Sequence, residues 1–403
     1  MNKNRIIENK NKESFVKKWG VVFVLSLALA IILIDSTVLN VSISVLIKEL
    51  NTDIQGIQWI ITLYSLVLAS LTITGGRLGD LFGRKKMFVF GAIIFALGSL
   101  IAALSNSLGM LAFGWSVVEG IGAALMMPAT ASLLVSKFKG KDRNIAFGIW
   151  GGVAAASTAI GPLLGGYLTT NFSWRWAFAI NIFVVLLVVI GSIYVSEYKD
   201  DNEKPTLDIF GVILSSLGLL SVVFGIIQST DYGWIKAKQM FNAFGVNWDF
   251  SGYSISIVSI IIGLILLLIF MYWEARIESK GKTPLVSLKI FTNKQFNAGL
   301  ATSMVMSLGQ AGLIFSIPVF IQAVLGKDAF HTGLAMLPLS IAAFICAPLG
   351  GFLSHKIPPK YLVQFGLFLN FIGYLVLRSS FSTSATTSDL ILGLIILGSG
   401  MGF

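Results

Sequence analysis

The chain has 403 residues, of which 55% are hydrophobic and only 12% are charged, and its formal net charge at pH 7 is +10. A soluble domain carries a charged fraction of about 25%, so this composition excludes an ordinary soluble protein. The basic residues lie between apolar runs, which argues against a nucleic-acid partner. The one cysteine, Cys346, excludes a disulfide within the chain and a cysteine metal cluster.

The apolar residues gather in runs of roughly 20, the length that crosses about 30 Å of hydrocarbon as a helix. No water is present there to bond the backbone, so each run is expected to be α-helical. A polar segment, 1–18, precedes the first run and is too long for the basic part of a cleaved signal peptide. The sequence predicts twelve spans: 19–47, 56–76, 87–105, 108–136, 143–170, 174–195, 207–228, 253–274, 295–325, 330–353, 360–379 and 389–403.

The loops between these spans indicate the orientation. With a cytoplasmic N-terminus, 23 of the 29 Lys and Arg residues fall in cytoplasmic segments and six fall outside. Cytoplasmic loops of membrane proteins carry such an excess of positive charge. We therefore expect a multi-pass protein of the cell membrane whose segment 1–18 is a cytoplasmic tail.

An internal repeat indicates the architecture. The sequence GGRLGDLFGRKKM at 75–87 returns as GGFLSHKIPPKYL at 350–362, an offset of 275 residues and eight predicted helices. Repeated halves around a midplane site are typical of secondary transporters. Six-helix halves would repeat after six helices, so two extra helices are expected between them. The predicted division is a tail (1–18), an N-terminal half (19–200), two added helices with linkers (201–290) and an incomplete second half of about four helices (291–403).

The last residues, GSGMGF at 398–403, resemble the fourth span at 119–123, after which the first half continues through more than two helices. We therefore expect the chain to be a fragment that lacks the end of helix 12 and two further helices. A natural protein of eleven or twelve helices remains the alternative.

The loop at 75–86, GGRLGDLFGRKK, joins the second span to the third. Its glycines would let the second helix approach a neighbour closely, and its aspartate could pair with a cation or a helix N-terminus. The loop resembles motif A of the major facilitator superfamily, and an ordinary positive-inside loop is the alternative. The resemblance implies a conformational latch that consists of Gly76, Arg77, Asp80, Gly83 and Arg84.

The fifth span contains Gly-Pro-Leu-Leu-Gly-Gly at 161–166. It resembles motif C, which the antiporters of this superfamily carry, with generic glycine packing as the alternative. A proline inside a helix removes one hydrogen bond and bends it. We expect Gly161, Pro162, Gly165 and Gly166 to bend this span and to let it contact helices of the other half.

The first span reads Leu-Ile-Asp-Ser-Thr-Val-Leu-Asn-Val at 33–41, and the sixth begins Trp-Arg-Trp-Ala-Phe-Ala-Ile-Asn at 174–181. Both runs resemble signatures of fourteen-helix drug:proton antiporters of the EmrB/QacA type. The resemblance implies an all-α membrane protein with the major facilitator fold: two six-helix halves, two extra helices between them, and here a truncated second half.

Only two acidic residues lie deep in apolar runs, Asp35 and Glu119, and no Lys, Arg or His does. A charge there costs at least several kcal/mol, so both are functional candidates. Burial favours the protonated carboxyl, which suits proton exchange. Counted along straight helices, both lie roughly 17–20 Å from the outer face. A neutral, hydrogen-bonded structural carboxyl is the alternative for each.

The fourth span departs from motif B, Arg-x-x-Gln-Gly, because it has Ser116 for the arginine and Glu119 for the glutamine. Proton coupling through that arginine is therefore not carried over. Trp115, Glu119 and Met126 recur at helical spacing, and an aromatic ring, a carboxyl and a thioether suit a lipophilic cation. Ordinary packing is the alternative for this face. Other intramembrane amides, either substrate contacts or interhelical glue, are Asn40, Asn181, Gln310 and Asn370.

Together these observations predict proton-coupled export of lipophilic, cationic drugs by alternating access. The expected partners are a small-molecule substrate, protons and the lipid bilayer, with no cofactor, no metal and a monomeric state. No phosphate loop, zinc site or nucleophile–histidine pair points to an enzyme. A dedicated exporter of one metabolite or antibiotic, and a sensor that binds without transporting, remain the alternatives.

Overall fold

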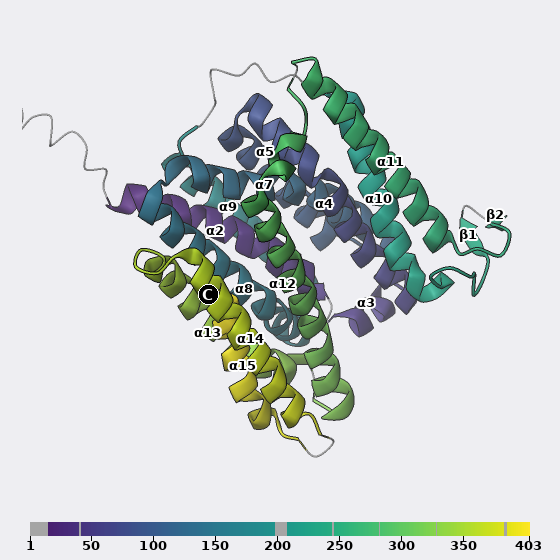
Figure 1. Ribbon diagram of the computed structural model, residues 1–403. Helices are drawn as coiled ribbons and strands as arrows, with labels where there is room; N and C mark the ends of the chain where they lie inside the picture. Colours follow the sequence, from purple (N-terminus) through teal and green to yellow (C-terminus); the bar gives the residue numbers. More distant parts are fainter. Residues whose placement is uncertain are drawn as a thin grey trace, which may run out of the picture. The chain divides into compact units, whose positions relative to one another are not determined.

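The computed structural model describes residues 15–39, 42–197, 208–243, 246–281, 283–327, 329–382 and 385–403. Within these ranges the regular structure is helical apart from one short hairpin, as the apolar runs predict (Figure 1). The helices of the first part are α2 (Phe15–Val38), α3 (Ile43–Glu49), α4 (Ile54–Phe82), α5 (Arg84–Ala103), α6 (Leu108–Leu111), α7 (Gly120–Lys137), α8 (Gly140–Asn171) and α9 (Arg175–Gly191).

A π-helix, Ala112–Glu119, joins α6 to α7, so the fourth predicted span is one continuous helical stretch. Its N-terminus at Leu108 is capped by Ser107, whose hydroxyl accepts from the amide of Met110. Asp53 caps α4 in the same way, because its carboxylate accepts from the amide of Gly56 at 2.8 Å.

The later helices are α10 (Ile209–Tyr232), α11 (Ile255–Ser279), α12 (Lys294–Val319), α13 (Ala329–Leu353), α14 (Pro359–Ser380) and α15 (Thr387–Gly402). A hairpin of β1 (Phe241–Ala243) and β2 (Val246–Trp248) lies between α10 and α11, with Phe241 opposite Trp248. Short 3₁₀ segments occur at Ser192–Tyr194 and Leu288–Thr292, and a π-helix, Phe320–Val324, follows α12.

Each of the twelve predicted spans contains a helix, and nine helices of the described chain are long and apolar enough to cross a membrane. The helix α8 makes a tenth, although the axes of its two parts, 140–158 and 160–171, differ by 41°. The helix α15 is shorter, with 16 residues. The chain is therefore a multi-pass helical membrane protein, as expected.

The first predicted span, 19–47, is wrong as a single helix, because α2 ends at Val38 and α3 begins at Ile43. Near this end the hydroxyls of Ser36 and Thr37 donate to the carbonyl of Leu33. Such back-bonding competes with the helical ladder. The depth derived for Asp35 counted a straight helix as far as Lys48, and that premise does not hold.

The helices form two compact units, each described by itself. In the first unit α8 packs against α2 and α13, and α15 packs against α13 and α14 (Figure 1). In the second unit α10 packs against α11 and α4, and the π-helix Ala112–Glu119 packs against α4 and α5. These units are defined by spatial contact, so the predicted division at 200 and 290 by sequence repeat stays a prediction.

The internal repeat reappears in the packing of Gly91 and Gly366, which are 275 residues apart. Gly91 of α5 lies against Gly122, and a Cβ on it would come within 2.9 Å of that carbonyl oxygen. Gly366 of α14 lies against Gly400, where the same distance would be 2.7 Å. Real Cβ atoms essentially never come closer than 3.0 Å to a neighbouring atom, so both close helix approaches require glycine.

Candidate functional site

Asp35 and Asn181 form a buried polar pair in the first unit. The amide Nδ2 of Asn181 in α9 donates to Oδ1 of Asp35 in α2 at 2.8 Å. The exposed fraction is 0% for Asp35 and 1% for Asn181. The sequence predicted both as intramembrane residues, and the structure brings them together.

The signature at the start of α9 fixes the helix that carries Asn181. The ring of Trp174 is fully buried, and the guanidinium of Arg175 lies 4.4 Å from its centroid. A cation over an aromatic face stabilises both groups. Phe178, one turn further on, meets Trp174 edge-on with centroids 6.1 Å apart. Asn181 follows on the same helix and reaches Asp35.

The glycines of the motif C resemblance pack against the end of α2, the helix that carries Asp35. A Cβ on Gly161 would clash with the hydroxyl of Thr37, and one on Gly165 would clash with the carbonyl of Val38. These two glycines therefore bring α8 against α2, and not against a helix of the second half as expected. Gly166 is buried as well.

Other residues of α8 contact α13, a helix of the predicted second half. A Cβ on Gly148 would lie 2.6 Å from the carbonyl oxygen of Ala347 in α13, and Gly333 of α13 lies against Leu163. The 41° bend between these contacts falls just before Pro162. Pro162 has no N–H for the carbonyl of Thr158, which is the physical reason for a bend there.

Glu119 is the last residue of the π-helix in the second unit and is fully buried. Gly98 of α5 lies against it, since a Cβ at 98 would come within 2.7 Å of the Glu119 Cβ. The hydroxyl of Ser116 donates to the carbonyl of Ile60 in α4 at 2.6 Å. Single π-turns inside α-helices are often found at functional sites.

The face predicted as a drug pocket is occupied by packing in this structure. The indole of Trp115 stacks on the ring of Tyr64, with centroids 5.1 Å apart and an interplanar angle of 9°. Met126 is fully buried, and its Cγ would be 3.0 Å from a Cβ on Gly91. Gln310 is half-buried in α12, and Asn40 lies outside the described residues. The roles proposed for these side chains stay predictions.

The loop of the motif A resemblance is a sharp break between α4 and α5. Gly83 adopts a φ of 107°, which only glycine takes without strain. Across the break, Arg84 pairs with Asp80 at 3.1 Å, as expected for a cation partner. Gly75 lies against the carbonyl of Ala124, and a Cβ on Gly76 would lie 3.7 Å from the Pro128 Cβ. Arg77, in the last turns of α4, is half-buried.

A third fully buried carboxyl, Glu274, was not singled out from the sequence because it lies at the predicted end of its span. It is 0% exposed, and its Oε2 accepts from the amides of Leu285 at 2.6 Å and Val286 at 3.3 Å. Glu274 thereby ties the segment after α11 to the end of that helix. The sequence feature that could have identified Glu274 is a single acidic residue at the end of an apolar run of about 20 residues.

Asp208 lies beside Glu274 at the start of α10. The indole Nε1 of Trp273 donates to Asp208 Oδ2 at 2.9 Å. A Cβ on Gly211 would clash with Asp208 and would come within 2.6 Å of Glu274 Oε1, so this glycine keeps space for both carboxyls. Two carboxyls and an indole thus join the adjacent ends of α10 and α11.

Comparisons with known proteins agree on one superfamily. The model of the Major Facilitator Superfamily matches residues 25–403. The chain is 29% identical over 396 residues to the probable actinorhodin transporter of Streptomyces coelicolor, covering 96% of this chain and 65% of that protein. It is 27% identical over 346 residues to the multidrug export protein EmrB of Escherichia coli, covering 86% and 64%.

The multidrug efflux pump LfrA of Mycolicibacterium smegmatis is 28% identical over 388 residues, covering 96% of this chain and 72% of that protein. Among solved structures, the proton:xylose symporter XylE matches with a TM-score of 0.62 and 13% identity over 97% of this chain and 80% of that one, a likeness of fold alone. The chain spans slightly less than two thirds of the length of most of these curated relatives.

Proposed function

This chain belongs to the major facilitator superfamily, and on that premise we propose that it exports lipophilic, cationic drugs in exchange for protons. The names of relatives such as the multidrug export protein EmrB and the multidrug efflux pump LfrA support drug export. The probable actinorhodin transporter and the tetracenomycin C resistance and export protein support a second candidate, an exporter dedicated to one antibiotic.

The observation that carries the proposal is the buried pair of Asp35 and Asn181. A carboxylate inside a membrane span is costly, so a group kept there is a candidate for proton transfer. The Asn181 amide supplies a donor that supports the ionised form, while burial supports the protonated form. Asp35 can therefore alternate between two protonation states.

Exchange follows if drug and proton compete for the same carboxyl. A cationic drug binds better when Asp35 is ionised, and by linkage the proton weakens drug binding by the same factor. We propose that Asp35 releases its proton when drug binds on the inside and takes up a proton when drug leaves on the outside. Glu119, also buried, serves as a second carboxyl for strongly cationic substrates.

The loop around Gly83 has a separate role in the proposal. Its residues lie at the break between α4 and α5, where a change of backbone angle would change the angle between the two helices. We propose that Asp80 and Arg84 bias the equilibrium between inward-facing and outward-facing states without forming the drug pocket.

The test uses full-length protein in liposomes, with drug-induced proton release as the readout. Asp35→Asn should abolish proton-coupled efflux of every substrate. Asp231→Asn, which changes an exposed acid at the end of α10, is the matched control and should keep the wild-type rate. Exchange at the wild-type rate by Asp35→Asn would show that the mechanism is wrong.

A panel of substrates separates the two candidate functions. A multidrug exporter should move several unrelated lipophilic cations, and Glu119→Gln should impair divalent cations more than neutral compounds. Transport confined to one compound of the panel would favour the dedicated exporter.

The orientation needs its own experiment. Cysteines placed at two exposed sites, Lys86 and Trp248, after replacement of Cys346, should label from the cytoplasmic and the outer side respectively. Labelling of both from one side would contradict the proposed orientation.

A further inference from the structure

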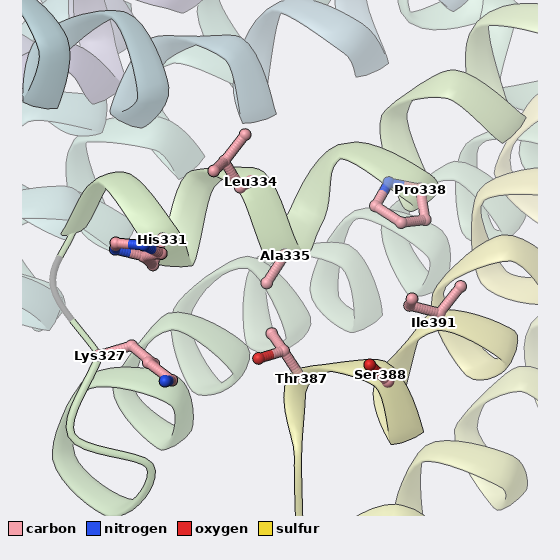
Figure 2. A pocket seen from close by; sticks show the side chains of 8 residues that line it. All are labelled: Lys327, His331, Leu334, Ala335, Pro338, Thr387, Ser388 and Ile391. Atoms are coloured by element: carbon pink, nitrogen blue, oxygen red, sulfur yellow. The ribbon is translucent and has the colours of Figure 1, made fainter.

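A pocket in the first unit lies between the first turns of α13 and α15 and has no role in the proposed exchange (Figure 2). Its volume is about 280 Å³, close to the lower end of the range of about 300–1,000 Å³ for small-molecule sites. It is lined by Lys327, His331, Leu334, Ala335, Pro338, Thr387, Ser388 and Ile391.

One end of the pocket consists of hydrogen-bond donors. Lys327 brings an ammonium group with three N–H donors, and His331 brings an imidazole. Thr387 and Ser388 add two hydroxyls from the first turn of α15. Figure 2 shows the Lys327 amine and the Thr387 hydroxyl on facing sides of the same space. Two polar side chains from α15 and two from the start of α13 and the loop before it therefore line the pocket.

Among the lining residues that the structure describes, Lys327 carries the formal charge, which is positive. None of the described lining residues is acidic. The nearby acid of α15, Asp389, is engaged in the helix cap, where it accepts from the amide of Thr386 at 2.8 Å and from its hydroxyl at 2.9 Å. An anion at the polar end would thus meet a lysine and two hydroxyls without an opposing carboxylate from the lining.

The apolar lining residues recur at helical spacing, so they lie along one face of each helix. Leu334 and Ala335 lie one turn after His331 on α13, and Pro338 lies one turn further on. Ile391 lies one turn after Thr387 on α15. Figure 2 shows Lys327 and His331 on one side of the pocket, and Pro338 and Ile391 on the other with Ser388 beside Ile391.

We propose that this pocket binds an amphiphilic anion, a phosphate or carboxylate group on a short apolar body. The charged group would contact Lys327, His331 and the α15 hydroxyls, and the apolar body would cover Leu334, Pro338 and Ile391. This chemistry is opposite in sign to the cationic substrates proposed above. The anion could be the headgroup of a lipid or a water-soluble amphiphile, and the experiment separates the two sources.

The experiment measures binding to purified full-length protein in a neutral detergent. The probes are octyl phosphate, phosphatidylglycerol in mixed micelles, and octyltrimethylammonium as the cation of matched chain length. We expect octyl phosphate, phosphatidylglycerol or both to bind, and the cation to bind at least tenfold more weakly. Binding of phosphatidylglycerol alone assigns the site to a lipid, and binding of octyl phosphate alone assigns it to a soluble amphiphile.

The variants test whether the pocket is the site. Lys327→Gln combined with His331→Gln should weaken anion binding at least tenfold, whereas Lys327→Arg should retain it. Arg378→Gln, which removes an exposed cation from the last turn of α14, is the matched control and should bind normally. Ile391→Trp fills the apolar part of the pocket at an exposed position and should block binding without a change of charge.

Three results would overturn the proposal. One is that neither anion binds more tightly than the cation. Another is that the double variant and Ile391→Trp both bind like the wild type. The third is that Arg378→Gln loses as much affinity as the double variant, which would show a general effect of surface charge. Transport is not measured, so this result is independent of the proposed exchange.

Discussion

Replacement of Asn181 by leucine should reveal the charge state of Asp35. The change keeps a side chain of similar size but removes the Nδ2 donor that lies 2.8 Å from Asp35 Oδ1. Hydrogen bonds to ionised groups contribute about 1.5–3 kcal/mol. Neutral side-chain pairs between membrane helices average about 0.6 kcal/mol. The size of the coupling therefore distinguishes a carboxylate from a protonated carboxyl.

The measurement is a double-mutant cycle of wild type, Asp35→Leu, Asn181→Leu and the double variant. The free energy of unfolding is measured in mixed micelles with a denaturing detergent at pH 5 and at pH 8.5. The cycle isolates the pairwise contribution because neither leucine can form a new hydrogen bond. We expect a coupling of about 1.5–3 kcal/mol at the pH where Asp35 is ionised and about 0.6 kcal/mol where it is protonated.

Each outcome has a definite meaning. A coupling that grows with pH supports a carboxyl that changes protonation state, as exchange requires. A small coupling at both pH values would identify a permanently neutral structural carboxyl. No measurable coupling at either pH would refute the pair itself and the assignment of Asn181.

Three further predictions concern the other sites. Asp80→Asn should abolish transport but leave drug affinity within about twofold; an equal loss of affinity would place Asp80 in the pocket. Gly98→Val should destabilise the protein by about 1–3 kcal/mol through overpacking against Glu119, whereas Gly109→Val, with open space around its Cβ, is the control. Glu274→Ala should speed amide hydrogen exchange at 285 and 286 at least tenfold; unchanged exchange would contradict its role as their acceptor.

Much of the fold could be predicted from the sequence because each membrane helix must satisfy its own backbone. Runs of roughly 20 apolar residues therefore gave the positions of the helices. The break between Val38 and Ile43 was missed because hydropathy does not register it. Ser36 and Thr37 donate to the carbonyl of Leu33 near the end of α2, which competes with the helical ladder, while the side chains around them remain largely apolar.

The sequence predicted the individual residues of the candidate site but not which of them contact one another. Asp35 and Asn181 were each placed inside the membrane, yet 146 residues separate them, and no local period reports such a contact. The face of Trp115 and Met126 followed from helical spacing, but spacing cannot tell a pocket from packing against α5. Glu274 was not predicted as a buried residue because it lies at the end of an apolar run, where a side chain is expected to contact solvent. In the structure the segment after α11 covers it.

The internal repeat gives a final prediction about Glu119. Gly98 packs against Glu119, and its repeat equivalent Gly373 packs against Leu397, where a Cβ would lie 3.0 Å from the Leu397 backbone nitrogen. Both neighbours are buried, so the same close approach of helices holds with a carboxyl in one copy and a leucine in the other.

The carboxyl is therefore not required for packing, and Glu119→Leu should leave the free energy of unfolding unchanged or raise it. Replacement of a buried polar group by an apolar one of similar size is near neutral when no buried partner is left without a hydrogen bond. The same variant should lose transport of divalent cations while it keeps transport of neutral compounds, measured in liposomes beside the unfolding experiment. A large loss of stability would show that Glu119 is a structural carboxyl, and it would contradict the proposed role of Glu119 in drug and proton exchange.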